Sequence, residues 1–340
     1  MLKFTKVILA AALTAAAGGA LAADIDFNSL KHRVSDESAP AVYFTADISP
    51  EGLNKAYEAL GRTLTGPVAV KLSTGEAGNN HYLQPSLIKD LVQKVDGTIV
   101  ECNTAYGGSR ASTAMHRQVI KDHGFDQIAK VDIMDEEGDM EIPVTGGKYL
   151  KADLVGSHLA NYKSMMVLTH FKGHAMGGFG GALKNISIGV ASASGKARIH
   201  TANYTDSVDE LWTADGGSYV SNDTDEHLMF IYSMAEAADA VSDYFDHGRE
   251  MLYISVMNNL SVDCDCDGSP DAPDMHDIGI LASLDPVALD QACVDLVYAA
   301  PDGASLIERM ESRRGPAILP HAQEMGLGST SYRLVSLDAQ

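Results

Sequence analysis

Between residues 68 and 134, short apolar runs alternate with amphipathic segments, and this alternation restricts the fold more than any other feature of the chain. The expected strands are 68–72, 98–102 and 130–134, and the expected helices are 85–95 and 112–122. Pro85 suits the first turn of a helix, and Gly124 marks the end of the second helix. Strands and helices that alternate with short connections predict an α/β fold, with a mostly parallel sheet flanked by helices.

The second half of the chain repeats this pattern less regularly. The expected strands are 165–169, 252–256 and 278–281, and the expected helices are 228–245, 287–298, 306–310 and 317–325. Asp285 is a natural N-cap for the helix that Pro286 begins. The segment 146–151 is the best candidate boundary, so we expect two α/β lobes, 23–150 and 151–340, with a cleft between them.

Composition excludes several classes of protein. A chain of 340 residues that is 45% hydrophobic and 21% charged can bury a large core, which excludes extended disorder. Acidic residues number 46 against 25 basic ones, giving a formal net charge of -21. Such a surface repels phosphate backbones, and no basic patch is evident, so we expect no nucleic-acid partner.

The first 22 residues have the pattern of a signal peptide. Lys3 and Lys6 precede an apolar run over 7–17, and small residues at Ala20 and Ala22 suit a cleavage site. The run is too short to span a bilayer comfortably, which disfavours an uncleaved anchor. We therefore expect a periplasmic or secreted protein with no transmembrane segment after cleavage.

A glycine-rich segment follows the expected strand 165–169, where open α/β sheets place ligands. Lys172 and Lys184 suit a carboxylate or phosphate, and His170 and His174 suit proton transfer or metal binding. We expect catalytic roles for His170, Lys172 and His174. Anion binding is expected from Lys184 and from the backbone of Gly177, Gly178, Gly180 and Gly181, with a following helix aiming its N–H groups at the anion. The alternative is a tight turn packed against the sheet.

An acidic turn over 263–277 contains many ligand-type side chains. The expected metal ligands are Asp263, Cys264, Asp265, Cys266, Asp267 and His276. Two thiolates with a histidine or an aspartate suit Zn²⁺ or Fe²⁺. Alternatively, Asp263, Asp265, Asp267, Gly268 and Asp274 match positions of an EF-hand-like calcium loop. Pro270 and the lack of a glutamate at the last position weigh against calcium, and a third interpretation is a solvated acidic turn.

Three further features carry weaker signals. The four cysteines, Cys102, Cys264, Cys266 and Cys293, are too few for a disulfide framework. A bridge between Cys264 and Cys266, which are two residues apart, would be strained, and the sequence leaves the redox state open. Asp290 is a carboxylate within an otherwise apolar helix, which suits a base with a shifted pKa or a group that supports a ligand. Lys71 ends an expected strand and precedes a polar loop.

Three motifs in order resemble the family known as domain of unknown function 362. They are HFKGHAMGGFGGALKNISIGVASASGK at 170–196, DCDC at 263–266 and DIGILASLDPVALDQACVDLV at 277–297. The resemblance runs from about residue 68 to 297 and implies an α/β fold without a known reaction. It also implies a polar cleft lined by Lys71, His170, Lys172, His174, Lys184, Asn185, Cys264, Cys266 and Asp285.

One departure from that family concerns its cofactor. Its members are often labelled as iron–sulfur-centre proteins, and many carry a ferredoxin-type run of cysteines after the glycine-rich motif. Residues 197–250 contain no cysteine here, so we expect no [4Fe–4S] cluster. We expect instead an exported metal-binding protein, with zinc or iron favoured over calcium, that acts as a metalloenzyme on a small anionic ligand. The alternatives are a noncatalytic protein that binds a metal or cofactor, and a calcium-stabilised scaffold.

Overall fold

The structure is a computed structural model that describes residues 25–217, 219 and 224–338. The predicted signal peptide therefore lies outside the described residues. Within the described part of the chain, no helix has the length and apolar character needed to cross a membrane.

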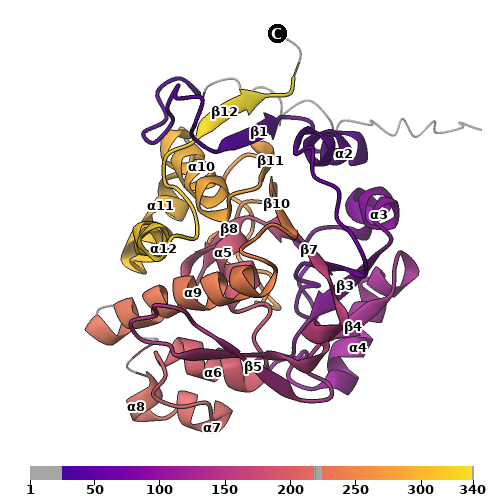
Figure 1. Ribbon diagram of the computed structural model, residues 1–340, viewed down its shortest axis with the longest axis vertical. Coiled ribbons are helices and arrows are strands. Elements are labelled where there is room, and N and C mark those ends of the chain that lie inside the picture. The colour runs from indigo at the N-terminus through magenta and orange to yellow at the C-terminus, as the bar shows by residue number, and fades with distance from the viewer. Residues whose placement is uncertain (1–24, 218, 220–223, 339–340) are drawn as a thin grey trace, which may run out of the picture.

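An eight-stranded sheet forms the centre of the molecule (Figure 1). Its strands, in spatial order, are β12 (Arg333–Ser336), β1 (Ala41–Thr45), β11 (Gly279–Ser283), β10 (Met251–Met257), β7 (Ser164–His170), β2 (Val68–Lys71), β3 (Gly97–Glu101) and β4 (Val131–Ile133). All pairings from β10 to β4 are parallel, as is the pairing of β12 with β1, whereas β11 runs antiparallel to both neighbours. The predicted fold, a mostly parallel sheet flanked by helices, is confirmed.

The central strands are apolar throughout because both faces of the sheet are covered. In β7, Val167 packs into one core, and its neighbours Met166 and Leu168 pack into the other. Side chains alternate between faces along a strand, so a strand buried on both sides reads as a continuous apolar run. This is why the sequence run 165–169 shows no polar alternation.

Helices cover the two faces of the sheet as separate groups (Figure 1). One face carries α2 (Pro50–Ala59), α3 (Pro85–Lys94) and α4 (Thr113–Asp122). The other carries α5 (Ala182–Ser187), α6 (Ala193–His200), α9 (Asp225–Tyr244), α10 (Pro286–Ala299), α11 (Ala304–Ser312) and α12 (Ile318–Met325). Two short helices, α7 (Val208–Leu211) and α8 (Ala214–Gly217), follow α6. Two small hairpins complete the fold: β5 (Asp139–Pro143) with β6 (Ala152–Gly156), and β8 (Lys172–His174) with β9 (Gly178–Gly180).

The eight-stranded sheet contains strands from both sides of residue 150. Strands β2, β3 and β4 precede the predicted boundary, and β7, β10 and β11 follow it. The two expected lobes thus share one sheet, and their division at residue 150 stays a prediction.

Candidate functional site

A pocket of about 490 Å³ lies at the carboxyl ends of the parallel strands. Lys71, Glu101 and His170 are the last residues of β2, β3 and β7, and all three line it. The loop over 263–268, which follows β10, forms another wall. Ligands bind at this edge of open α/β sheets because the loops that connect strand to helix converge there. The structure therefore brings together the glycine-rich segment and the Cys/Asp turn, as the resemblance implied.

The glycine-rich segment folds as the β8–β9 hairpin, which places Lys172 and His174 on the pocket wall. Gly173 allows the hairpin to approach the loop after β10, since a Cβ there would lie 2.3 Å from the carbonyl oxygen of Val262. Gly180 and Gly181 line the pocket. Gly177 and Gly178 are outside its lining, and Gly178 packs against Gly315 instead.

The N-terminus of α5 does not face an open anion site, which corrects the expectation drawn from the glycines. The buried Asp290 carboxylate of α10 accepts the N–H groups of Ala182 and Leu183 at 2.7 and 2.9 Å. Burial raises the pKa of Asp290 to about 7, although these hydrogen bonds oppose the rise. The Asp290 carboxylate therefore holds the N-terminus of α5 in place beside the pocket.

Five basic side chains line the pocket: Lys71, Arg110, Lys172, Lys184 and Lys196. Four have partners among the described residues. Lys71 Nζ donates to Asn185 Oδ1 at 3.1 Å and Lys196 Nζ to the carbonyl of Ala191 at 2.5 Å. Arg110 pairs with Glu101 at 3.3 Å, and Lys172 pairs with Asp265 at 2.8 Å.

Lys184 differs from these four, because its ammonium makes no hydrogen bond or ion pair with any residue in the described part of the chain. Its side chain is half-buried and borders the pocket. Burial, reinforced by the positive charges of Lys172 and Lys71, lowers the pKa of Lys184 to about 7. Burial likewise lowers the pKa of Lys71 to about 8. Five acidic side chains also line the pocket: Glu76, Glu101, Asp263, Asp265 and Asp267. Lys184 is therefore distinguished by its missing partner and not by an overall positive charge of the pocket.

His170 is held in a fixed position by two acceptors. Its Nδ1 lies 2.8 Å from Asp265 Oδ1, and its Nε2 lies 2.6 Å from the carbonyl oxygen of Asn258. Because both ring nitrogens face acceptors, neither offers a lone pair to a metal or a substrate proton. The expected metal or proton-transfer role of His170 does not fit this geometry. Burial tends to raise the pKa of Asp265, but Lys172 and His170 outweigh it and hold that pKa well below its usual value.

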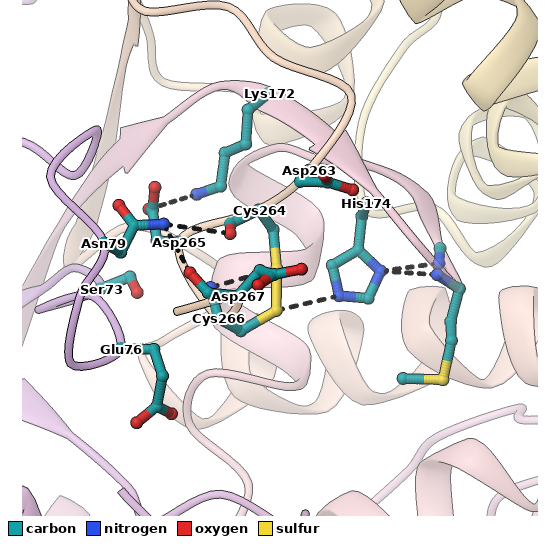
Figure 2. The surroundings of a disulfide bond; sticks show 12 residues. Ser73, Glu76, Asn79, Lys172, His174, Asp263, Cys264, Asp265, Cys266 and Asp267 are labelled. Atoms are coloured by element: carbon teal, nitrogen blue, oxygen red, sulfur yellow. Dashed lines mark hydrogen bonds and ion pairs between the residues drawn. A yellow bond between two sulfur atoms is a disulfide. The ribbon is translucent and has the colours of Figure 1, made fainter. Parts of the chain in front are cut away.

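Cys264 and Cys266 form a disulfide bond on the pocket wall (Figure 2). The sequence left the redox state of these cysteines open; here the turn brings their Cα atoms to 5.2 Å, and the two expected thiolate ligands are bonded to each other. His174 lies beside the bridge, with Nε2 3.8 Å from Cys266 Sγ. Its Nδ1 accepts the backbone N–H groups of Met176 and Gly177 at 3.1 and 2.8 Å. Burial, followed by the charge of Lys184, holds the pKa of His174 well below its usual value.

The remaining aspartates of the turn do not converge on a cation site. Asp263 pairs with Arg309 at 3.2 Å, and Asp267 accepts the N–H group of Ser269 at 2.8 Å. Among the described residues, the two groups with metal-ligand spacing are His174–Cys264–Cys266 and Asp132–Glu136–His158. Neither group contains an aspartate of the turn, so the calcium-loop interpretation has no support in this geometry.

Two predicted site residues lie away from the pocket. His276 Nδ1 is 2.8 Å from Asp302 Oδ1, outside the pocket lining. Asp285 caps α10 by accepting the N–H group of Ala288 at 2.9 Å, and it also accepts that of Ser329. It follows β11, and because β11 is antiparallel to β10, the carboxyl end of β11 is at the opposite edge of the sheet. Asp285 therefore has the structural capping role that its sequence context favours.

Several pocket residues were missing from the sequence-based set. Glu101, Arg110, Lys196, His200 and Trp212 all line the pocket. The position of Glu101 at the end of an expected strand was a usable signal. Lys196 and His200 belong to α6, and their sequence pattern alone suggests only a surface helix. Trp212 Nε1 donates to the carbonyl of Ala105 at 2.8 Å, which places the indole at the pocket although it is 50% exposed.

Comparison with family models gives a match of residues 68–295 to the domain of unknown function DUF362. The chain belongs to the DUF362 family. The resemblance read from the three motifs is thereby confirmed, and the matched region contains every strand that ends at the pocket of this DUF362 protein. Comparison with curated proteins gives no match.

Two solved structures show remote similarity to this DUF362 protein. The lactate racemase apoprotein from Thermoanaerobacterium thermosaccharolyticum is 13% identical, with a TM-score of 0.44 over 78% of this chain and 59% of that chain. A protein from Thermotoga maritima is 12% identical, with a TM-score of 0.40 over 75% of this chain and 58% of that chain. The DUF362 protein thus spans less than two thirds of the length of either neighbour.

Proposed function

We propose that this protein binds and acts on a small molecule carrying a carboxylate or a phosphate. The observation that carries the proposal is the Lys184 ammonium, which lacks an acceptor among the described residues and borders the pocket. A half-buried ammonium without a partner is unfavourable, and a bound anion supplies the missing interaction. Lys71 and Lys172 are near enough for their positive charges to lower the pKa of Lys184, and a bound anion would offset this repulsion.

The pocket also contains a group suited to proton transfer. With a pKa near 7, Lys184 is present in both protonation states at neutral pH, as an efficient general acid or base requires. This supports an enzyme over a protein that only captures its ligand. Incubating the protein with a panel of small carboxylates and phosphate esters, and following each by NMR, distinguishes the two. Binding without turnover of any compound would favour the noncatalytic alternative.

Metal binding is a second candidate function, favoured by the spacing of Cys264, Cys266 and His174. One ligand atom from each lies within 4.8 Å of the others, and thiolates with an imidazole suit zinc or iron. The fit is incomplete, because the sulfurs are bridged and Nδ1 of His174 already accepts two N–H groups. Metal ligation by His174 Nε2 requires loss of the proton that this nitrogen carries. We therefore expect zinc or ferrous iron to bind only after reduction of the bridge.

The anion proposal is tested by calorimetric titration with small carboxylates and with inorganic phosphate. Lys184→Met should weaken binding by about tenfold or more, since a hydrogen bond to a charged group contributes about 1.5–3 kcal/mol. Lys89→Met, which removes an exposed lysine of α3, is the matched control. Equal affinity of the Lys184 variant and the control would contradict the proposal.

The metal candidate is tested by elemental analysis after dialysis against zinc, with and without prior reduction. Stoichiometric zinc in the reduced protein, and its loss in the Cys264→Ser/Cys266→Ser variant, would support this function. Equal zinc contents of the variant and the reduced wild type would exclude the thiolates as ligands.

A further inference from the structure

The disulfide in the pocket wall is accessible and has little value as a structural crosslink. Cys266 is half-buried, Cys264 is buried, and both line the pocket. A disulfide stabilises a fold mainly by restricting the unfolded chain, and the restriction is small when the closed loop is short. A bridge between residues two apart closes a very short loop.

Other contacts hold the same turn in place without the bridge. The Asp265 carboxylate contacts His170 and Lys172, and the Asp265 carbonyl accepts the N–H group of Glu76 at 2.7 Å. Asn79 Nδ2 donates to the carbonyl of Asp267 at 2.8 Å (Figure 2). The sulfurs therefore stay near each other when the S–S bond is broken.

Each sulfur has a nearby N–H donor. Because Nδ1 of His174 accepts two backbone N–H groups, the single proton of the neutral ring is on Nε2, which faces Cys266 Sγ at 3.8 Å. The backbone N–H group of Cys266 faces Cys264 Sγ at 3.2 Å. A thiolate formed at either sulfur would thus receive a charge-assisted hydrogen bond.

The third cysteine at the pocket has the opposite environment. Cys102 Sγ donates to the carbonyl of Val190 at 3.2 Å, and burial raises the pKa of this thiol to about 12. A buried thiol of that kind is unreactive. The reactive sulfur chemistry of this pocket is therefore confined, among the described cysteines, to the bridged pair.

We propose that the Cys264–Cys266 bond is a redox-active disulfide that exchanges with small thiols entering the pocket, with His174 as the positioning residue for the Cys266 sulfur. The preferred thiols carry a carboxylate or phosphate, and this preference rests on the proposed anion-binding function.

The exchange balances with two thiols as the reductant. One thiolate attacks the more exposed Cys266 Sγ, the S–S bond breaks, and the electron pair leaves on Cys264 Sγ beside the N–H group of Cys266. A second thiolate attacks the outer sulfur of the mixed disulfide, and Cys266 Sγ leaves beside His174 Nε2. Two thiols are oxidised to one disulfide, the protein disulfide is reduced to two thiols, and the two thiol protons pass to the cysteines.

The first experiment measures reduction of the folded protein by 2-mercaptoethanol and by 3-mercaptopropionate at equal thiolate concentrations. Alkylation of the new thiols followed by peptide mass analysis reports Cys264 and Cys266 separately from Cys102 and Cys293. We expect complete and reversible reduction by both thiols, with the anionic thiol reacting several-fold faster. A bridge that resists both thiols in the folded protein, yet is reduced after denaturation, would overturn the proposal.

Two substitutions test His174 itself. His174→Phe removes the N–H donor and should disfavour the dithiol by about tenfold in its equilibrium with dithiothreitol. His174→Gln retains an N–H group near the same position and should restore most of that loss. Identical equilibrium constants for wild type and His174→Phe would remove His174 from the proposal. If the Phe variant does not fold, His174→Leu, which also lacks the N–H donor, takes its place in the same comparison.

The outcome for the anionic thiol separates this inference from the proposed function. If small carboxylates bind but the bridge is inert, the redox proposal fails alone. If both thiols react at equal rates and Lys184→Met leaves those rates unchanged, the anion preference fails while the redox couple stands.

Discussion

Asp265 Oδ2 lies 2.8 Å from Lys172 Nζ, and this buried ion pair joins two segments that are 93 residues apart in the sequence. It fixes the turn that carries the disulfide to the hairpin that carries His174. The pocket wall therefore depends on a contact between the two motifs that sequence analysis treated as separate candidate sites.

Asp265→Asn should destabilise the folded protein by about 3–5 kcal/mol, because it leaves Lys172 and His170 buried beside a neutral amide. The measurement is the free energy of unfolding in urea at pH 7. Asp274→Asn, in the exposed part of the same loop, is the control and should change that free energy by less than about 0.5 kcal/mol.

The same substitution should change the response to acid. The folded-state pKa of Asp265 lies below its usual value of 3.8, so its ion pairs contribute fully above that pH. This contribution is lost as the pH falls below about 4 toward the folded-state pKa. Wild type should lose more stability than Asp265→Asn between pH 5 and pH 3. Parallel losses in the two proteins would contradict the assignment.

Anion affinity should depend on pH through Lys184. Because its folded-state pKa is about 7, Lys184 is mostly protonated below pH 7 and mostly neutral above it when no ligand is bound. We expect the affinity for a small carboxylate to fall as the pH rises from 7 to 9. Lys184→Arg keeps its charge in this range and should abolish the fall. A calorimetric titration series at four pH values tests both statements.

Gly181→Ala should destabilise the fold by about 1–3 kcal/mol, because the added Cβ would lie 2.4 Å from Asp290 Oδ1. Asp290→Ala removes both the obstacle and the acceptor of two N–H groups. The double variant should therefore lose less stability than the sum of the single losses, as measured by thermal and urea unfolding. Additive losses would show that the two side-chain positions do not interact.

Ligand binding should be visible in the fluorescence of Trp212. The chain contains one tryptophan, and its indole is half-exposed at the pocket. A bound anion should change the solvent exposure of the indole and so shift its emission maximum. Titration with small carboxylates provides the measurement, and Lys184→Met should require a higher concentration for the same shift. An unchanged spectrum at saturation by calorimetry would place the ligand elsewhere.

Local patterns in the sequence were sufficient to predict the strands and helices that position the pocket. The apolar run 165–169 became the central strand β7, and Pro85 and the pair Asp285–Pro286 begin helices as expected. Such signals depend on neighbouring residues, because strand and helix periodicity and capping act over one or two turns of chain. The three ordered motifs were likewise sufficient to indicate the family.

Contacts between distant segments were decided only by the tertiary structure. Asp285 lies away from the pocket because β11 runs antiparallel to β10. The Asp290 carboxylate accepts a hydrogen bond at the N-terminus of α5. The bridge between Cys264 and Cys266 depends on the conformation of one turn, which Asp265 fixes through His170 and Lys172. Residue type and spacing do not specify these pairings, because they depend on packing across the whole sheet, where partners are brought together from positions about 90 or more residues apart.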